Sequence, residues 1–399
     1  MLDIKQIIKE IVKKILPNSV LFILRRFFWG NYCYILWLFP IKKNKIVISN
    51  YDGKGYGDNG KYIVEQIIEQ NLNIDIVWLL NKELIGKSSF PPQVRVVKNR
   101  SLRALYELAT AKIWIDNCRK CFYPPKRKDQ IYIQTWHGGI ALKKVEKDAE
   151  SKLNYTYINK AKNDSKIANL FISNSKFCSN LYRDAFWYNG DIIECGSPRN
   201  DIFFKNDTHA KEKVCKSFKL NEQINILLYA PTFRADYGVN LYKMNFKKLI
   251  NVVEDATKNE WCVLVRLHPN ISDKADFMQY DSKVINATDY DDMYELLAAA
   301  DILITDYSST MFEFSLMYKP VLLYTPDIEE YKKDRDFYFN IFSLPFPVAE
   351  TEEQLYKLIQ NFDHKMYTQR LKSFFNELGI VEDGNAAKRV VELIMHNMF

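Results

Sequence analysis

Two histidines stand where apolar, strand-like runs of this sequence end. His137 follows IYIQTW and precedes Gly138 and Gly139, and His268 follows WCVLVRL and precedes Pro269. Imidazole changes its protonation state near neutral pH, so either side chain could accept a proton from a hydroxyl group. A histidine that only closes a turn is the competing interpretation of each motif taken alone. Both residues are therefore candidate catalytic groups.

Cationic and hydroxyl-bearing side chains accompany the two histidines. Guanidinium and ammonium groups at strand ends are suited to bind phosphate, and hydroxyl groups can donate hydrogen bonds to it. The set consists of Lys143 and Lys144 after His137, Thr232 and Arg234 at the end of LLYAPTFR, and Arg266 two residues before His268. These residue types predict a site for a phosphate-bearing ligand.

A third group of polar residues lies in ADILITDYSSTMFEF. The pattern predicts a buried strand, then Asp306, Tyr307, Ser308 and Ser309, then a helix that begins near Thr310. Free N–H groups and hydroxyls at a helix start can bind an anion, although ordinary N-capping by either serine explains the same residues. One turn further, Glu313 could bind a hydroxyl-bearing ligand such as a ribose, or it could be a solvated helix residue.

The elements that must position these groups alternate along the chain from Lys45 onward. Short runs rich in Ile and Val alternate with helical patterns, which is typical of parallel sheets covered on both faces. One set of strands is KIVISN, IDIVWLL, VRVVK, IWIDN, IYIQTW, LFISN and DIIECG, and a second is INILLYA, WCVLVRL, KVINA, DILITD and PVLLY. We expect an α/β fold of two Rossmann-like domains facing across a cleft, over residues 45–205 and 206–365, with C-terminal helices over 366–399 packing on the body.

Charge is distributed unevenly along the 399 residues. The net charge is +7, and residues 1–45 by themselves hold nine Lys/Arg against Asp3 and Glu10, so the remainder is balanced. A basic body that binds nucleic acid is therefore not predicted. The seven cysteines show no paired halves at zinc spacing, and no DxD-like pair has a clear metal role. We expect no cofactor and no required metal.

The basic N-terminal segment, residues 1–44, is also amphipathic. Isoleucines at helical spacing lie opposite lysines, and FFWGNYCYILWLFP follows Arg25 and Arg26. Pro17, the arginine pair and Gly30 interrupt the apolar runs below the ~18–20 residues that span a bilayer. We expect peripheral binding to an anionic membrane surface, while packing of these helices on the body or on a second subunit is the alternative.

Taken in order, five segments resemble the CDP-glycerol glycerophosphotransferase family of teichoic acid priming enzymes and polymerases. They are TWHGGIALKKVEKD (135–148), FISNSKFCSNLYRDAFWYNGDIIECGSPRND (171–201), LLYAPTFR (227–234), LVRLHPN (264–270), and DMYELLAAADILITDYSSTMFEFSLMYKPVLLY (292–324) with DIEEYKKDRDFYF (327–339). The resemblance covers about residues 45–345 and implies the glycosyltransferase-B fold and the cytoplasmic face of the cell membrane.

The resemblance also implies roles for single residues. His137 matches the proposed base for the acceptor hydroxyl, with Gly138, Lys143 and Lys144 on the acceptor side. His268 matches the second essential histidine, on the donor side. The segment with Asp306, Ser308 and Ser309 matches the part that holds the donor phosphates, to which charge and position add Thr232, Arg234, Arg266 and Glu313. One departure is Gly139-Ile140, where many relatives have Thr-Pro.

The leading hypothesis is transfer of glycerol phosphate, or a related alditol phosphate, from a CDP-activated donor to a hydroxyl of a cell-surface glycan or lipid-linked acceptor, with release of CMP. The product would be a teichoic acid or capsule-type polymer. A nucleotide-sugar glycosyltransferase of the same fold is the first alternative, and a non-catalytic binding partner is the second. Gly55, Gly57 and Gly60 match a dinucleotide fingerprint, but the acidic residue that an NAD site requires is missing at the expected place.

Overall fold

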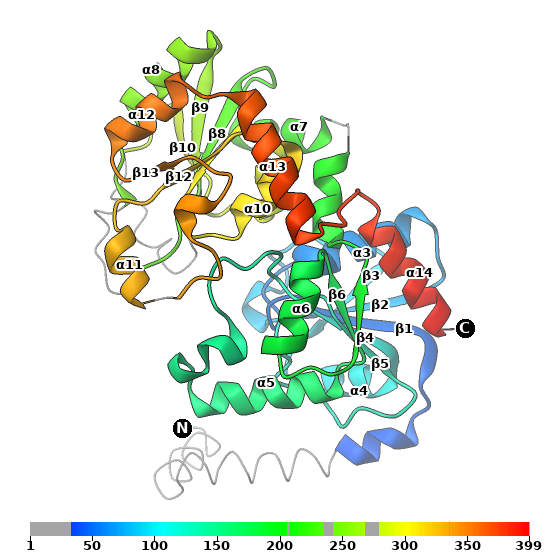
Figure 1. Ribbon diagram of the computed structural model, residues 1–399. Helices are drawn as coiled ribbons and strands as arrows, with labels where there is room; N and C mark the ends of the chain where they lie inside the picture. The colour runs from blue at the N-terminus through cyan, green and yellow to red at the C-terminus, as the bar shows by residue number, and fades with distance from the viewer. Residues whose placement is uncertain (1–32, 206–207, 235–241, 268–278, 335, 399) are drawn as a thin grey trace, which may run out of the picture.

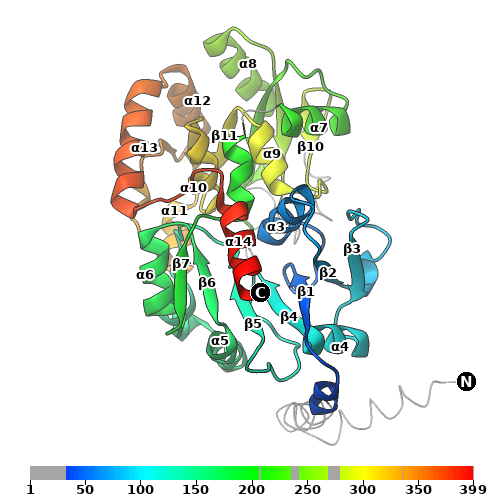
Figure 2. The same cartoon turned by 90° about the vertical axis from the view of Figure 1, so that its right-hand side faces the viewer.

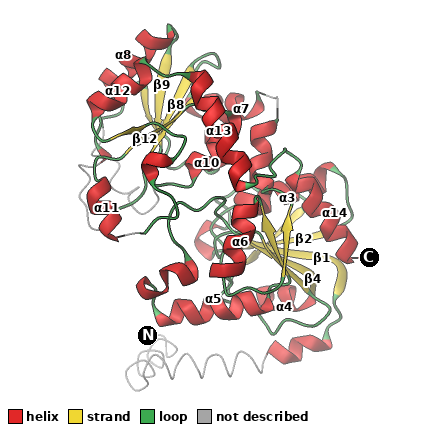
Figure 3. Cartoon of the chain, viewed as in Figure 1, coloured by secondary structure: helices red, strands yellow, loops and turns green. Residues whose placement is uncertain are grey.

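The computed structural model describes residues 33–205, 208–234, 242–267, 279–334 and 336–398. Its strands form two separate sheets, each with all strands parallel (Figures 1 and 3). The first sheet has the order β3-β2-β1-β4-β5-β6-β7, with β1 (Lys42–Ser49), β2 (Asp75–Leu80), β3 (Val94–Lys98), β4 (Ala111–Asp116), β5 (Ile131–Gln134), β6 (Leu170–Ser173) and β7 (Asp191–Glu194). The second has the order β10-β9-β8-β11-β12-β13, with β8 (Asn225–Tyr229), β9 (Trp261–Val265), β10 (Val284–Asn286), β11 (Ile302–Thr305), β12 (Val321–Tyr324) and β13 (Val348–Ala349).

Helices connect the strands and cover both faces of each sheet (Figure 2). The α-helices are α3 (Asp58–Glu69), α4 (Leu102–Thr110), α5 (Tyr155–Ile167), α6 (Lys176–Ala185), α7 (His209–Phe218), α8 (Phe246–Thr257), α9 (Met293–Ala299), α10 (Thr310–Phe314), α11 (Ile328–Asp334), α12 (Glu352–Gln360), α13 (His364–Leu378) and α14 (Ala386–Met398). The 3-10 helices are η1 (Leu36–Leu38), η2 (Lys82–Leu84), η3 (Glu146–Lys152), η4 (Pro198–Phe204), η7 (Ser315–Met317) and η8 (Ile341–Ser343).

The strands are buried on both sides because their apolar residues are consecutive. In β1, Val47 belongs to one hydrophobic core, whereas Ile46 and Ile48 belong to another on the opposite face. Successive side chains of a strand point to opposite faces, so a continuous apolar run requires helices on both. The face of Ile46 is covered by α3 and by α14, which contributes Val390 and Ile394.

Side chains at the helix starts explain where several helices begin. The hydroxyl of Ser101 accepts a hydrogen bond from the N–H of Ala104 at α4, and the hydroxyl of Ser175 accepts one from Cys178 at α6. Each hydroxyl oxygen accepts from a main-chain N–H group that has no carbonyl partner within the first turn of the helix. Capping thus fixes where these two helices begin.

The predicted α/β class with two sets of parallel strands is confirmed. The strand β13 was not predicted, because a two-residue strand shows no periodicity. The proposed domain boundaries stay predictions. Of the predicted N-terminal segment, residues 1–32 lie outside the described residues, and among the described helices none is both long and apolar enough to cross a membrane.

The chain reverses its direction of strand addition once in each sheet. In the first sheet this happens between β1 and β4, and in the second between β8 and β11. Loops that follow two such strands diverge, which opens a crevice for ligands at the carboxyl edge. The candidate site residues are therefore expected at these two places.

Candidate active site

His137 lies beside the end of β4, although it follows β5 in the chain. Its Nδ1 atom lies 2.6 Å from the main-chain oxygen of Asn117, the residue directly after β4. A carbonyl oxygen only accepts, so Nδ1 must hold the proton. In the neutral ring Nε2 then has the free electron pair, and within the described part of the chain it has no hydrogen-bond partner.

The surroundings of His137 keep its ring neutral. Burial lowers the pKa of His137, while the hydrogen bond to Asn117 and the carboxylate of Asp58 act in the opposite direction. A neutral imidazole at physiological pH is the form that can accept a proton. The predicted general-base candidate thus has the tautomer and the charge state that the role requires.

The residue before His137 adopts a strained backbone conformation. Trp136 has a φ of 55°, in the left-handed region that non-glycine residues rarely occupy. The centre of its ring lies 4.3 Å from the centre of the His137 imidazole and 4.8 Å from the centre of the Phe186 ring. The guanidinium carbon of Arg119 lies 5.4 Å from the centre of the Trp136 ring. Strain of this kind persists only where packing enforces it, and it is concentrated at functional sites.

The two glycines after His137 pass close to other elements. The carbonyl oxygen of Gly138 accepts a hydrogen bond of 3.4 Å from the hydroxyl of Tyr182. A Cβ atom on Gly139 would lie 3.0 Å from Nδ2 of Asn174 and 3.5 Å from Oε1 of Glu313. The glycine therefore leaves room for the Asn174 amide, whereas Glu313, from the second sheet's side, would lie at an ordinary van der Waals distance.

Lys143 and Lys144 lie on a connection between the two halves of the molecule. Lys143 pairs with Phe337 in an isolated antiparallel bridge, and its ammonium lies 5.4 Å from the centre of the Tyr331 ring. The N–H of Lys144 donates to the oxygen of Asp336 at 2.8 Å, and its side chain is exposed. Their assignment to the acceptor side stays a prediction.

The predicted donor residues of the second sheet gather where β8 and β11 end. Both oxygens of Asp306 accept from the N–H of Thr232, at 2.9 and 3.0 Å, and Asp306 also pairs with Arg234. Arg234 in turn binds Asp327 through two hydrogen bonds of 2.9 and 3.1 Å. The Thr232 hydroxyl is buried and has no partner among the described residues.

This arrangement gives Arg234 a structural task that the sequence did not indicate. The residue is 6% exposed, and the two carboxylates raise its pKa against the opposing effect of burial. The guanidinium also lies 4.9 Å from the ring of Tyr307. Arg234 and Asp306 therefore hold loops after different strands together, and their contact with a donor stays a prediction.

The helix predicted near Thr310 is present but short. It spans five residues as α10 and continues as η7. The hydroxyl of Ser308 accepts from the hydroxyl of Thr310 at 2.9 Å, and Ser309 makes no side-chain cap hydrogen bond. Phosphate binding by these serines stays a prediction.

Glu313 is not the solvated helix residue that one interpretation of the sequence allowed. It is 2% exposed, pairs with Arg199, and accepts a hydrogen bond of 3.0 Å from the hydroxyl of Tyr294. A ribose contact, the other interpretation, stays a prediction. The reason for the error is that a single glutamate in a short helix carries no periodic signal of burial.

The remaining predicted donor residues are Arg266 and His268. One Nη atom of Arg266 donates to the main-chain oxygens of Ala287, at 3.1 Å, and Tyr290, which fixes the loop after β10. Burial lowers the pKa of Arg266. His268 lies outside the described residues, so its role on the donor side stays a prediction.

Sequence reasoning missed three polar residues around His137. They are Tyr51 and Asp58, from the glycine-containing loop after β1 and the start of α3, and Arg199, from η4. Arg199 is 1% exposed and lies between the carboxylates of Asp58 and Glu313. The available signal was its place in SPRND, the segment that follows the predicted strand DIIECG.

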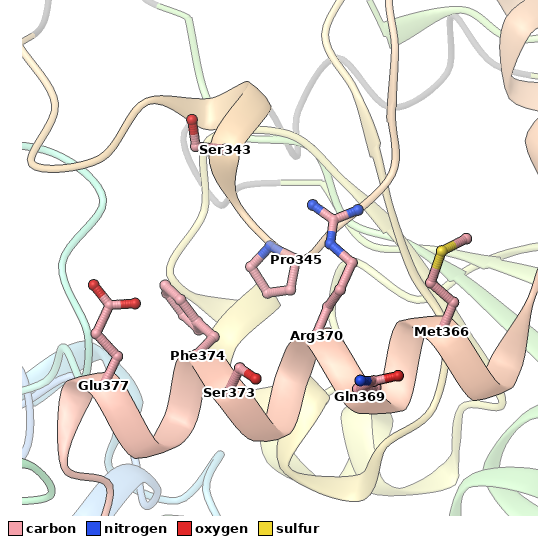
Figure 4. A pocket seen from close by; sticks show the side chains of 8 residues that line it. All are labelled: Ser343, Pro345, Met366, Gln369, Arg370, Ser373, Phe374 and Glu377. Carbon is pink, nitrogen blue, oxygen red and sulfur yellow. The ribbon is translucent and has the colours of Figure 1, made fainter.

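Two further features of the described residues bear on the site. A groove along α13 is lined by residues that include Met366, Arg370 and Phe374 (Figure 4), and none of the predicted site residues lines it. No group of three or more His, Cys, Asp or Glu side chains in the described ranges is arranged to hold a metal ion. Independence of metal stays a prediction.

A neutral histidine with an available Nε2 at the carboxyl edge of a parallel sheet is suited to an enzyme that takes the proton of a hydroxyl group. The chain belongs to the CDP-Glycerol:Poly(glycerophosphate) glycerophosphotransferase family, whose profile matches residues 32–396. The family predicted from the sequence motifs is thereby confirmed.

Relatives with known names support the same family. The chain is 30% identical to a teichoic acid poly(glycerol phosphate) polymerase of Bacillus spizizenii over 376 residues, covering 90% of this chain and 94% of the relative. It is 28% identical to a teichoic acid glycerol-phosphate transferase of Staphylococcus aureus, covering 97% and 99%. A ribitol-phosphate primase of Bacillus spizizenii is 29% identical, with coverage of 90% and 92%.

Solved structures agree with the sequence relatives. The wall teichoic acid polymerase TagF superposes with a TM-score of 0.81 at 26% identity, covering 100% of this chain and 99% of that chain. A histidine-to-asparagine variant of TagF soaked with CDPG superposes with the same TM-score. The likeness extends over both sheets.

Proposed function

We propose that this protein transfers glycerol phosphate, or a related alditol phosphate, from a CDP-activated donor to a hydroxyl of a glycan or lipid-linked acceptor in teichoic acid synthesis. The observation that carries the proposal is the hydrogen bond from Nδ1 of His137 to Asn117, which leaves Nε2 able to accept a proton. The names of the relatives, which include both glycerol-phosphate and ribitol-phosphate enzymes, support the donor class.

The chemistry follows from that tautomer. Nε2 of His137 takes the proton of the acceptor hydroxyl, the oxygen attacks the phosphorus that bears the alditol, and the bond from this phosphorus to the CMP oxygen breaks. The negative charge moves to CMP, which leaves. A positioned base contributes roughly 10²–10⁴ in rate, and positioning with positive charge supplies most of the remainder in phosphoryl transfer.

The proposal includes the overall architecture and the location of the protein. Two parallel sheets, each with candidate residues at its carboxyl edge, support the glycosyltransferase-B arrangement with the acceptor at the first sheet and the donor at the second. Peripheral binding to the cytoplasmic face of the cell membrane is supported by exposed apolar side chains in the described part of the basic N-terminal segment. These are Ile35, Trp37, Leu38 and Phe39, which are 41–83% exposed.

The test is CMP release by the purified protein. CDP-glycerol, CDP-ribitol and UDP-, GDP- and CMP-sugars are offered with and without a membrane extract as acceptor, and with and without EDTA. We expect acceptor-dependent CMP release from a CDP-alditol, unchanged by EDTA and reduced at least ~10²-fold in His137→Ala. Turnover of a nucleotide sugar alone would establish the glycosyltransferase alternative, and a fully active His137→Ala variant would reject the base.

A further inference from the structure

A buried arginine joins the two halves of the molecule next to the candidate base. Nη1 of Arg199 lies 2.7 Å from Oδ2 of Asp58, the first residue of α3, and Nη2 contacts Oε1 of Glu313 on α10. Asp58 belongs to the first sheet's side and Glu313 follows β11 of the second sheet. The guanidinium thus links residues that are far apart in the chain.

The link continues from Asp58 to the imidazole. The hydroxyl of Tyr51 donates to Oδ2 of Asp58 at 2.9 Å, and the centre of the Tyr51 ring lies 5.3 Å from that of His137. Tyr51 and Asp58 have φ values of 43° and 54°, in the left-handed region. Backbone strain at both residues indicates that this placement is enforced by the surrounding contacts.

A second connection runs through the main chain. The N–H of Arg199 donates to Oδ1 of Asn59 at 3.1 Å, and Nδ2 of Asn59 donates to the oxygen of Trp136 at 3.1 Å. Trp136 directly precedes His137. Arg199 is therefore linked to His137 by two routes: through the side chains of Asp58 and Tyr51, and through Asn59 to the peptide unit that precedes the histidine.

We propose that four side chains, together called the Arg199 network, are positioning residues for His137. They are Glu313, Arg199, Asp58 and Tyr51. Because Glu313 belongs to the second sheet's side, the contact of that side with Arg199 fixes the orientation of the His137 imidazole. This inference rests on the proposed function. Its physical basis is that a displacement of about 1 Å at a catalytic group can cost on the order of 10²-fold in rate. Glu313, which the sequence assigned to the donor, thereby acts on the acceptor side.

The structure offers a matched network that does not contact His137. Lys61 on α3 binds Asp292 at 2.6 Å and Glu295 at 2.7 Å, and the hydroxyl of Tyr62 donates to Asp292 at 3.2 Å. The hydroxyl of Tyr290 donates to Glu295 at 2.8 Å. Glu295, like Glu313, is buried on the second sheet's side and pairs with a cation from the first.

The experiment compares four conservative variants of the full chain in the CMP-release assay. Glu313→Gln and Tyr51→Phe remove a charge and a hydroxyl from the Arg199 network, and Glu295→Gln and Tyr62→Phe make the same changes in the Lys61 network. We expect the first two to lower kcat about tenfold or more with donor KM within about twofold, and the controls to stay within about twofold of wild type. The kcat of the double variant of Glu313 and Tyr51 should be no lower than that of the slower single variant. Both residues act on His137 through the same series of contacts, so their effects do not add.

A second measurement does not depend on turnover. The ring ¹⁵N signals of His137, assigned by their loss in His137→Ala, should move in Glu313→Gln and stay in place in Glu295→Gln. Equal kcat values for Glu313→Gln and Glu295→Gln, together with unmoved His137 signals, would overturn the inference. If His137→Ala is inactive in the same assay, the proposed function is unaffected by that result. Full activity of His137→Ala would reject the proposed function and the inference together.

Discussion

The imidazole of His137 and the main-chain oxygen of Asn117 are joined by a hydrogen bond of 2.6 Å between two neighbouring strand ends. Because β4 and β5 pair in parallel, both strands end at the same edge of the sheet, and the residue after one can reach the other. The direction of this hydrogen bond decides which ring nitrogen can act as a base. The pH dependence of the reaction follows from it.

We expect the acid limb of the pH profile of kcat/KM to have its midpoint below 6.5. Burial lowers the pKa of His137 from that ordinary value, and the base is active only when neutral, so activity should persist to lower pH than for an exposed histidine. The Asp58 carboxylate raises this pKa, so Asp58→Asn should move the midpoint further down. A midpoint above 6.5 in wild type would contradict the assignment, provided that circular dichroism shows the fold intact at each pH.

Arg234→Ala should destabilise the protein by about 3–5 kcal/mol, because it leaves Asp306 and Asp327 buried without their cation. Urea unfolding measures this loss. The matched control is Lys248→Ala, which removes an exposed pair with Glu353 and should cost at most about 1 kcal/mol. Equal losses in the two variants would show that Arg234 does not hold the loops together.

Acid should weaken the fold through Glu107. Its pKa is lowered to about 2 by Lys45 and Arg95 against the effect of burial, so its contribution to stability is complete above the unfolded pKa and is lost as the pH falls toward 2. We expect wild type to lose on the order of 2–3 kcal/mol from this group below pH 4.5. The free energy of unfolding should fall less steeply with pH in Glu107→Gln, and an unchanged slope would contradict the prediction.

Deletion of residues 1–40 should release the protein from anionic vesicles. The segment contains most of the excess positive charge, and its described part exposes Trp37 and Leu38. Co-sedimentation with phosphatidylserine-containing vesicles measures binding, with neutral vesicles as the control. Tight binding of the truncated protein to anionic vesicles would contradict membrane attachment through this segment. The alternative, in which the segment packs on the body or on a second subunit, would then be favoured.

Consecutive apolar residues such as Ile46, Val47 and Ile48 predicted the strands from the sequence alone. The pattern of burial depends on neighbouring residues, so every strand of both sheets except β13, and the alternation of strands with helices, could be predicted from the sequence. The motif around His137 could also be found, because it directly follows a predicted strand. The family followed from the order of five such motifs.

Only the tertiary structure decided which charged groups meet. Glu313 pairs with Arg199, 114 positions earlier, and Arg234 pairs with Asp327, 93 positions later. No local pattern encodes such a partner, because it depends on which strand ends lie side by side and how the two sheets approach each other. The sequence therefore determined the elements and the candidate base, whereas the folded chain determined that Arg234 holds loops together and that Glu313 is linked to His137.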